Sequence, residues 1–350
     1  MIFMRPLLID GSYGEGGGQI LRTAIALSAI TGTPIKIINI RKKRKNPGLR
    51  NQHLTSIKAV ATICGAKVDG LRLGSTEVAF YPQSPRPGKY FFDVGTAGSI
   101  TLVLQSLLPV LSLIDGAFEV KIRGGTDVPW SPPVDYLKYV LRPILSMMGF
   151  GFEIDVISRG FYPAGGGEVI IRGEGGKLTG IRLEERGRLL EVGASIWLYN
   201  LPGHILERMK RTLMVRAYNA FKMTPKINID VGKSLSPGTG VVLYAKFEKT
   251  ILGADRLGEK GVRAETVAIE CVNKLEKELN SKATLDIHAA DQVQLFMSLA
   301  NGTSTYITRE LSNHAQTNMW VITQFLGEIF ESRKIDSGEY LIKISGKPYW

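Results

Sequence analysis

The hydrophobic and polar positions of the chain follow one order that recurs. Residues 6–82 begin with a short apolar run that predicts a strand, followed by a glycine-rich loop. Apolar spacing of three and four residues then predicts a helix at 19–31. A strand at 35–40, a basic loop, a helix at 52–64 and two short strands complete this first unit.

The same order of elements returns twice. Residues 90–172 contain a strand, a glycine loop, an apolar helix at 102–114, another strand, a loop and a helix at 136–148, and end in paired strands. A third copy starts late, at His288, and its second helix is expected over 316–330. A period of about 80 residues predicts related sheet-and-helix units rather than a solenoid.

Between the second and third copies lies a stretch of different texture, which predicts an inserted α+β domain at residues 185–281. It has its own helix after Pro202 and a long charged helix at about 262–279. The expected fold is therefore α/β (α+β). Three repeated units, at 1–184 plus 282–350, form a catalytic domain that carries the smaller insert.

The repeat brings loops together. In each copy two loops precede helices, and units that pack alike would place these loops on one face. Helix N-termini that converge over a sheet form a plausible ligand crevice. The six loops are 11–18, 41–51, 95–99, 124–134, 288–292 and 309–315.

The glycine-rich stretch from Tyr13 to Arg22 is the strongest local signal. Four glycines before a helix leave backbone N–H groups free at a positive dipole end, which favours phosphates. Glu15 would repel a phosphate unless a hard divalent cation lies between them. The alternative is a turn that needs glycine only for positive φ and close packing. The stretch matches neither a P-loop nor the dinucleotide fingerprint.

The amino-acid composition narrows the class of protein. The 350 residues are 44% hydrophobic and 22% charged, as in globular proteins. No apolar run reaches the ~18–20 residues of a membrane span, so no membrane association is expected. Asp10 comes too early for a secretory signal, and Cys64 and Cys271 suggest buried thiols rather than a disulfide framework. A cytoplasmic location is the expectation.

The net charge of +12 is unevenly distributed. Eight Lys/Arg and no Asp/Glu lie between Lys36 and Lys58. This concentration indicates a polyanionic partner, such as a nucleic acid, a nucleoside triphosphate or both. A solvated basic loop is the simpler alternative for any single lysine.

The chain has four histidines, at 53, 204, 288 and 314. His53 and His314 occupy corresponding loop-to-helix positions in copies one and three, and both should face the ligand crevice. The pattern alone does not choose between them. The sequence has no spacing typical of a Ser-His-Asp triad or a histidine–cysteine metal cluster.

Several of these segments together resemble one family. They are Gly14-Glu15-Gly16-Gly17-Gly18-Gln19-Ile20-Leu21-Arg22, Pro47-Gly48-Leu49-Arg50-Asn51-Gln52-His53, Gly124-Gly125-Thr126-Asp127, Phe161-Tyr162-Pro163-Ala164-Gly165-Gly166-Gly167 and Asp291-Gln292. In order and over nearly the full length, the chain resembles the RNA 3'-terminal phosphate cyclases. The resemblance implies three α/β copies with an insert. It also implies ATP-dependent conversion of an RNA 3'-phosphate into a 2',3'-cyclic phosphate through a covalent histidine–AMP.

The resemblance also assigns residues. The nucleophile falls on His314 and the metal ligand, for Mg²⁺ or Mn²⁺, on Glu15. The adenine side falls on Gln105, Pro132, His288, Ala289, Ala290, Asp291 and Gln292, although position 288 is often a phenol in relatives. The triphosphate contacts fall on Arg22, Arg41, Arg44, Gln52 and His53.

The family also includes non-catalytic cyclase-like proteins of ribosome assembly, which lack the nucleophile. An RNA-binding assembly factor is therefore the alternative function, and the presence of His314 argues against it. Enolpyruvate transferases share a related repeated architecture, so the fold alone does not decide the function. The expected partners are RNA with a 3'-phosphate end and ATP, with a homo-oligomer as a further possibility.

Overall fold

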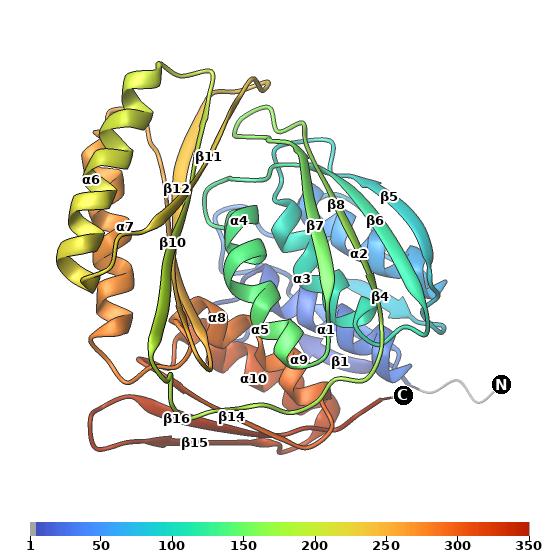
Figure 1. Cartoon of the computed structure of the whole chain (residues 1–350). Helices are drawn as coiled ribbons and strands as arrows, with labels where there is room; N and C mark the ends of the chain where they lie inside the picture. Colours follow the sequence, from blue (N-terminus) through green and yellow to red (C-terminus); the bar gives the residue numbers. More distant parts are fainter. Residues whose placement is uncertain (1–4, 350) are drawn as a thin grey trace.

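The computed structural model describes residues 5–349. Helices lie between peripheral sheets, with the insert on one side of the molecule (Figure 1). Residues 5–349 form four sheets of four strands each, one for each repeated unit and one in the insert. Within 5–349, no helix combines the length and hydrophobicity needed to cross a membrane.

The first unit gives the pattern that the others follow. Its elements are β1 (Leu7–Asp10), α1 (Gly18–Thr31), β2 (Ile35–Ile38), α2 (Asn51–Cys64), β3 (Lys67–Asp69) and β4 (Val78–Tyr81). The strand order is β1-β2-β4-β3. β1 and β2 run parallel and are joined by α1, whereas the β2–β4 and β3–β4 pairs are antiparallel.

The second unit repeats this topology. Its elements are β5 (Gly88–Asp93), α3 (Ile100–Leu111), β6 (Ala117–Gly124), α4 (Val134–Tyr136), the π-helical turn η1 (Leu137–Leu141), α5 (Arg142–Met147), β7 (Phe152–Ser158) and β8 (Gly167–Glu174). The order β5-β6-β8-β7 again has one parallel pair followed by antiparallel ones. The predicted second helix of this unit is thus a succession of three helical segments.

The third unit corrects the sequence-based boundaries. It comprises β9 (Arg182–Leu183), α8 (Ile287–Gln292), α9 (Gln294–Leu299), β14 (Thr303–Thr308), α10 (Asn313–Leu326), β15 (Phe330–Lys334) and β16 (Tyr340–Ser345). β9 pairs in parallel with β14, so this copy begins before the insert and not at His288. A strand of two residues has too little periodicity to be recognised. The predicted helix at 316–330 is wrong at its end, because Gly327, with φ of 72°, terminates α10 and Phe330 begins a strand.

The insert has a separate hydrophobic core. Its elements are β10 (Leu189–Tyr199), α6 (Gly203–Phe221), β11 (Lys226–Gly232), β12 (Gly238–Phe247), β13 (Ile251–Leu257) and α7 (Ala264–Leu279). α6 and α7 lie side by side on one face of the sheet β11-β10-β12-β13 (Figure 1). Every buried residue of this core lies between Val192 and Ala283. The domain boundaries at 184/185 and 281/282 stay a prediction.

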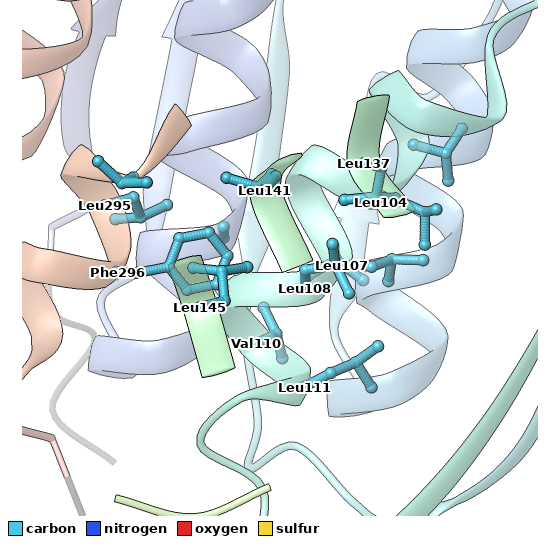
Figure 2. Packing of buried hydrophobic residues seen from close by; sticks show 14 of the residues in the cluster. Leu104, Leu107, Leu108, Val110, Leu111, Leu137, Leu141, Leu145, Leu295 and Phe296 are labelled. Atoms are coloured by element: carbon cyan, nitrogen blue, oxygen red, sulfur yellow. The ribbon is translucent and has the colours of Figure 1, made fainter. Parts of the chain in front are cut away.

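The helices of the three units form the main core. α1 contacts α2, α3 and α10, so it joins all three units. Leucines of α3, η1 and α5 interlock with Leu295 and Phe296 of α9 (Figure 2). Both cysteines are buried free thiols, as expected. Because helices from different units meet here, their N-terminal ends and the preceding loops become neighbours.

Candidate active site

The glycine loop before α1 rests against α10 and α2. A Cβ on Gly14, whose φ is +52°, would lie 2.2 Å from Oγ1 of Thr317 in α10. A Cβ on Gly18 would lie 2.3 Å from Nε2 of His53 and 3.0 Å from Nη1 of Arg22. Close packing therefore requires glycine at both positions. The same closeness brings a histidine and an arginine to the first turn of α1, where backbone N–H groups attract anions.

His314 is oriented by a buried carboxylate. It is the second residue of α10, whose first turn is capped by the Ser312 hydroxyl, which accepts from the backbone N–H of Ala315 at 3.0 Å. The His314 Nδ1 lies 2.6 Å from Asp291 Oδ2. Gln19 Nε2 donates to the other oxygen, Asp291 Oδ1, at 2.8 Å. Because a carboxylate only accepts, Nδ1 carries a proton, and in the neutral ring the Nε2 lone pair is then free.

A buried amide holds this arrangement. Asn318 Oδ1 accepts from the Thr23 hydroxyl at 2.7 Å, and its Nδ2 donates to Asp291 O and Gln294 Oε1, both at 3.2 Å. These bonds fix α1, α8, α9 and α10 relative to one another. Thr23 and Asn318 were not predicted as site residues. The available signal was a polar residue within each buried helix face.

A pocket next to His314 collects part of the predicted adenine side. Its lining residues are Gln19, Arg22, Thr23, Thr101, Gln105, Leu108, Pro109, Pro132, Leu137, Leu141, Asp291, Gln292, Leu295, Phe296, His314 and Asn318. Arg22 Nε donates to Gln105 Oε1 at 3.0 Å, and Gln105 Nε2 donates to Gln292 Oε1 at 3.4 Å. An apolar wall with a few convergent polar groups is typical of a small-molecule site.

Three of the residues predicted for the adenine side do not line this pocket. His288 is exposed on the first turn of α8, and its ring is roughly perpendicular to that of Tyr136, with 6.4 Å between the centroids. Ala289 and Ala290 are buried beneath it. The Ala290 carbonyl accepts from the Tyr306 hydroxyl at 3.1 Å. Ala289 and Ala290 thus pack α8 against the core, while Asp291 and Gln292 line the pocket.

His53 has surroundings opposite to those of His314. It is 4% exposed, and its Nδ1 accepts from the backbone N–H of Arg50 at 3.0 Å. The proton is therefore on Nε2, next to Gly18. Burial lowers the His53 pKa to about 3, with further lowering by the charges of Arg22, Arg41 and Arg50. This imidazole is a neutral N–H donor surrounded by cations.

The residues predicted to contact the triphosphate lie around the start of α1, beside His53. Burial lowers the pKa of Arg22 to about 10. Arg41 Nη1 donates to the Asn46 and Gly48 carbonyls, both at 2.9 Å, so it also shapes the basic loop. Gln52 Oε1 accepts from the Ser99 N–H at 3.2 Å, which ties α2 to the glycine loop of the second unit.

Glu15 lies in the glycine loop before α1 and is exposed. Its Oε2 is 3.6 Å from Arg44 Nη2, and both side chains are about half exposed. Within 5–349 no group of three His, Cys, Asp or Glu side chains is placed to hold a metal ion. A cation at Glu15 would therefore take most ligands from phosphate oxygens and water, as Mg²⁺ commonly does.

Comparison with known proteins identifies the family of this chain. The family model described as "RNA 3'-terminal phosphate cyclase" matches residues 13–332. The chain belongs to this family. Proteins named RNA 3'-terminal phosphate cyclase are 45% identical in Hyperthermus butylicus, over 98% of this chain and 99% of that one, and 44% identical in Nitrosospira multiformis, over 97% and 96%. The relative of that name in Pyrococcus furiosus is 45% identical over 93% and 94%.

A solved structure, the enolpyruvyl transferase NikO from Streptomyces tendae, covers 97% of this chain and 48% of its own. Its TM-score of 0.42 at 11% identity carries no argument about this fold or its function.

Proposed function

We propose that this chain converts the 3'-terminal phosphate of RNA into a 2',3'-cyclic phosphodiester, with ATP consumed, through AMP carried on His314. Family membership supports the reaction and its two substrates. One observation carries the choice of residue. Asp291 binds Nδ1 of His314, which leaves the Nε2 lone pair free beside a pocket lined by Gln105, Pro132 and Gln292.

The first step is nucleophilic. Nε2 of His314 attacks the α-phosphorus of ATP, an N–P bond forms, and the bond to pyrophosphate breaks. Asp291 stabilises the positive charge that the ring gains and keeps the tautomer fixed. Arg22, Arg44 and the N–H of His53 offset the charge of the departing pyrophosphate, because phosphoryl transfer depends mainly on positioning and electrostatics.

Two displacements on the RNA follow. An oxygen of the RNA 3'-phosphate attacks the phosphorus of the adenylate, and the N–P bond to His314 breaks. The neighbouring 2'-hydroxyl then loses its proton, attacks the 3'-phosphorus and displaces AMP. The product is the cyclic phosphodiester, and His314 is free again.

Glu15 fits a divalent cation, Mg²⁺ or Mn²⁺. Its carboxylate stands half exposed next to Arg44 at the glycine loop, where a lone carboxylate would otherwise repel a phosphate. Such an ion, when bound, neutralises phosphate charge. We expect Glu15→Ala to slow self-adenylylation far more than transfer from a pre-formed adenylate, because the second step releases no pyrophosphate. Equal loss in both steps would assign Glu15 a structural role.

The direct test is incubation with α-labelled ATP and a divalent cation, followed by denaturation and peptide mapping. Label on the peptide that contains His314 is expected. A protein that takes no label would instead fit the non-catalytic assembly factor. A cytoplasmic location and a homo-oligomer stay predictions.

A further inference from the structure

Two of the sequence motifs take no part in the chemistry above, yet the structure joins them. Residues 124–127 lead into the loop 125–133, and residues 161–167 lie in the loop 160–167. The Thr126 N–H donates to the Gly160 carbonyl at 2.8 Å, and the Gly160 N–H donates to the Thr126 hydroxyl at 3.0 Å. The two loops are therefore one structural unit.

Two more loops complete this surface. The Gly125 N–H donates to the Gly98 carbonyl at 2.9 Å, which adds the loop 95–99. The Ala164 N–H donates to the Ser236 hydroxyl at 3.1 Å, which adds the insert loop 233–237. We name the surface formed by 95–99, 125–133, 160–167 and 233–237 the loop face.

The loop face adjoins the pocket beside His314. Pro132 lines that pocket, and its carbonyl accepts from the Thr101 hydroxyl at 2.7 Å. Ser99 contacts Gln52 at the start of α2, next to His53. A chain that ends in the pocket therefore passes close to this surface.

Large apolar side chains stand out from the loop face. Trp130 is 97% exposed, two residues before Pro132, and Tyr162 is 70% exposed in the neighbouring loop. Leu235 of the insert loop is 71% exposed. Within residues 5–349 neither Trp130 nor Tyr162 has an aromatic ring against it. The two exposed rings thus stand on loops that are joined by backbone hydrogen bonds, one of which also reaches the pocket through Pro132.

The charge of the loop face suits a polyanion. Its four segments contain one acidic residue, Asp127, which is buried and bound to Arg159 at 3.0 Å. Lys233 is exposed in the insert loop. The one carboxylate within these four segments is thus bound to an arginine, and the exposed Asp93, just before the first segment, accepts from the Gly95 N–H at 2.7 Å.

We propose that Trp130 and Tyr162 form a stacking platform for the last bases of a single-stranded RNA whose 3'-phosphate enters the pocket. This inference rests on the proposed function. Single-stranded RNA is typically bound by stacking on aromatic side chains, and stacking tolerates any sequence because every base has a π-face. The platform gives the insert a role, since its loop 233–237 borders the RNA.

The test separates RNA binding from nucleotide chemistry. Trp130→Ala and Tyr162→Ala should each raise the KM for a short 3'-phosphorylated RNA by about 10- to 100-fold, the range expected for one lost stacking contact. Labelling by ATP alone should keep its wild-type rate. Trp130→Phe and Tyr162→Phe should restore most of the affinity, because a phenyl ring still stacks.

An abasic RNA identifies the contact. Removing the terminal or the penultimate base should weaken binding to the wild type as much as Trp130→Ala weakens binding of intact RNA, and the two changes should not add. Tyr218→Ala, another exposed aromatic, on α6, is the matched control and should leave the KM unchanged.

Unchanged KM in both alanine variants would overturn the proposal and favour a protein partner for these rings. Phenylalanine variants as weak as the alanine variants would exclude stacking. Failure of ATP labelling in the wild type would contradict the proposed function instead, so the two failures are distinguishable.

Discussion

His53 and His314 stand at the start of the second helix of their units, but the two helices begin differently. His53 is the third residue of α2, whereas His314 is the second residue of α10. One residue corresponds to about 100° of rotation around a helix, so the two rings leave in different directions. The two histidines therefore lie at corresponding loop-to-helix junctions, as expected, but not at the same residue position within the helix. By helix position, Gln52 is the counterpart of His314.

The hydrogen-bond partners of the two imidazole rings differ as well. A backbone donor binds Nδ1 of His53 and leaves a buried N–H, whereas an acceptor binds Nδ1 of His314 and leaves a half-exposed lone pair. This difference fits the proposed roles, in which the N–H of His53 donates to a phosphate and the Nε2 lone pair of His314 acts as the nucleophile. The sequence pattern alone could not separate these two roles.

The largest expected effect is that of His314→Ala. Self-adenylylation should fall to background, because no other imidazole in the described chain combines the pocket with a free, oriented lone pair. The measurement is label retained on denatured protein after incubation with α-labelled ATP. A variant that still takes label, or a label mapped to His53, would exclude the assignment.

Asp291→Asn tests the tautomer of His314. The amide has the size of the carboxylate but can offer its N–H to Nδ1, which would leave the proton on Nε2. We expect the rate of labelling to fall by about 10²- to 10⁴-fold, by analogy with other histidines oriented by a carboxylate, with a smaller change in KM for ATP. The matched control is Gln19→Leu, which removes the donor to Asp291 Oδ1 but keeps the carboxylate. An equal loss in both variants would argue for packing rather than the tautomer.

His53→Ala should have a smaller effect of a different kind. Labelling should persist, with a KM for ATP raised by about tenfold, the loss expected when a hydrogen bond to a charged phosphate is removed. His53→Gln, which has an N–H at a similar distance, should recover part of the affinity. Complete loss of labelling in folded His53→Ala would place this histidine in the bond-forming step.

The sequence predicted the arrangement of the molecule better than its details. Hydrophobic periodicity identified long apolar helices such as α1 and α3, and the repeat brought the right loops to one place. β9 was missed because two residues carry no period. Gln105, Pro132, Asp291 and Gln292 line one pocket, and their contact with adenine stays a prediction, whereas His288 lies outside this pocket because α8 turns that side chain to the solvent. Polar residues on buried helix faces marked Thr23 and Asn318 as candidates, but the sequence could not show that they are bound to each other, because they lie 295 positions apart.

Acid stability tests the buried state of His53. Its pKa is about 3 in the fold, compared with 6.5 for the free side chain. Above pH 6.5 the ring is neutral in both states and contributes no pH dependence. As the pH falls below 6.5, the unfolded chain binds a proton that the folded chain does not, so the free energy of unfolding falls by about 1.4 kcal/mol per pH unit.

His53→Gln removes this site and, as an acceptor at the third helical position, can still bind the Arg50 N–H. Between pH 7 and pH 5, without nucleotide, the wild type should therefore lose about 2 kcal/mol more than the variant. Equal losses in wild type and His53→Gln, measured by urea unfolding at the two pH values, would mean that His53 accepts a proton in the folded protein. The contrast with His314 would then rest on hydrogen bonding alone.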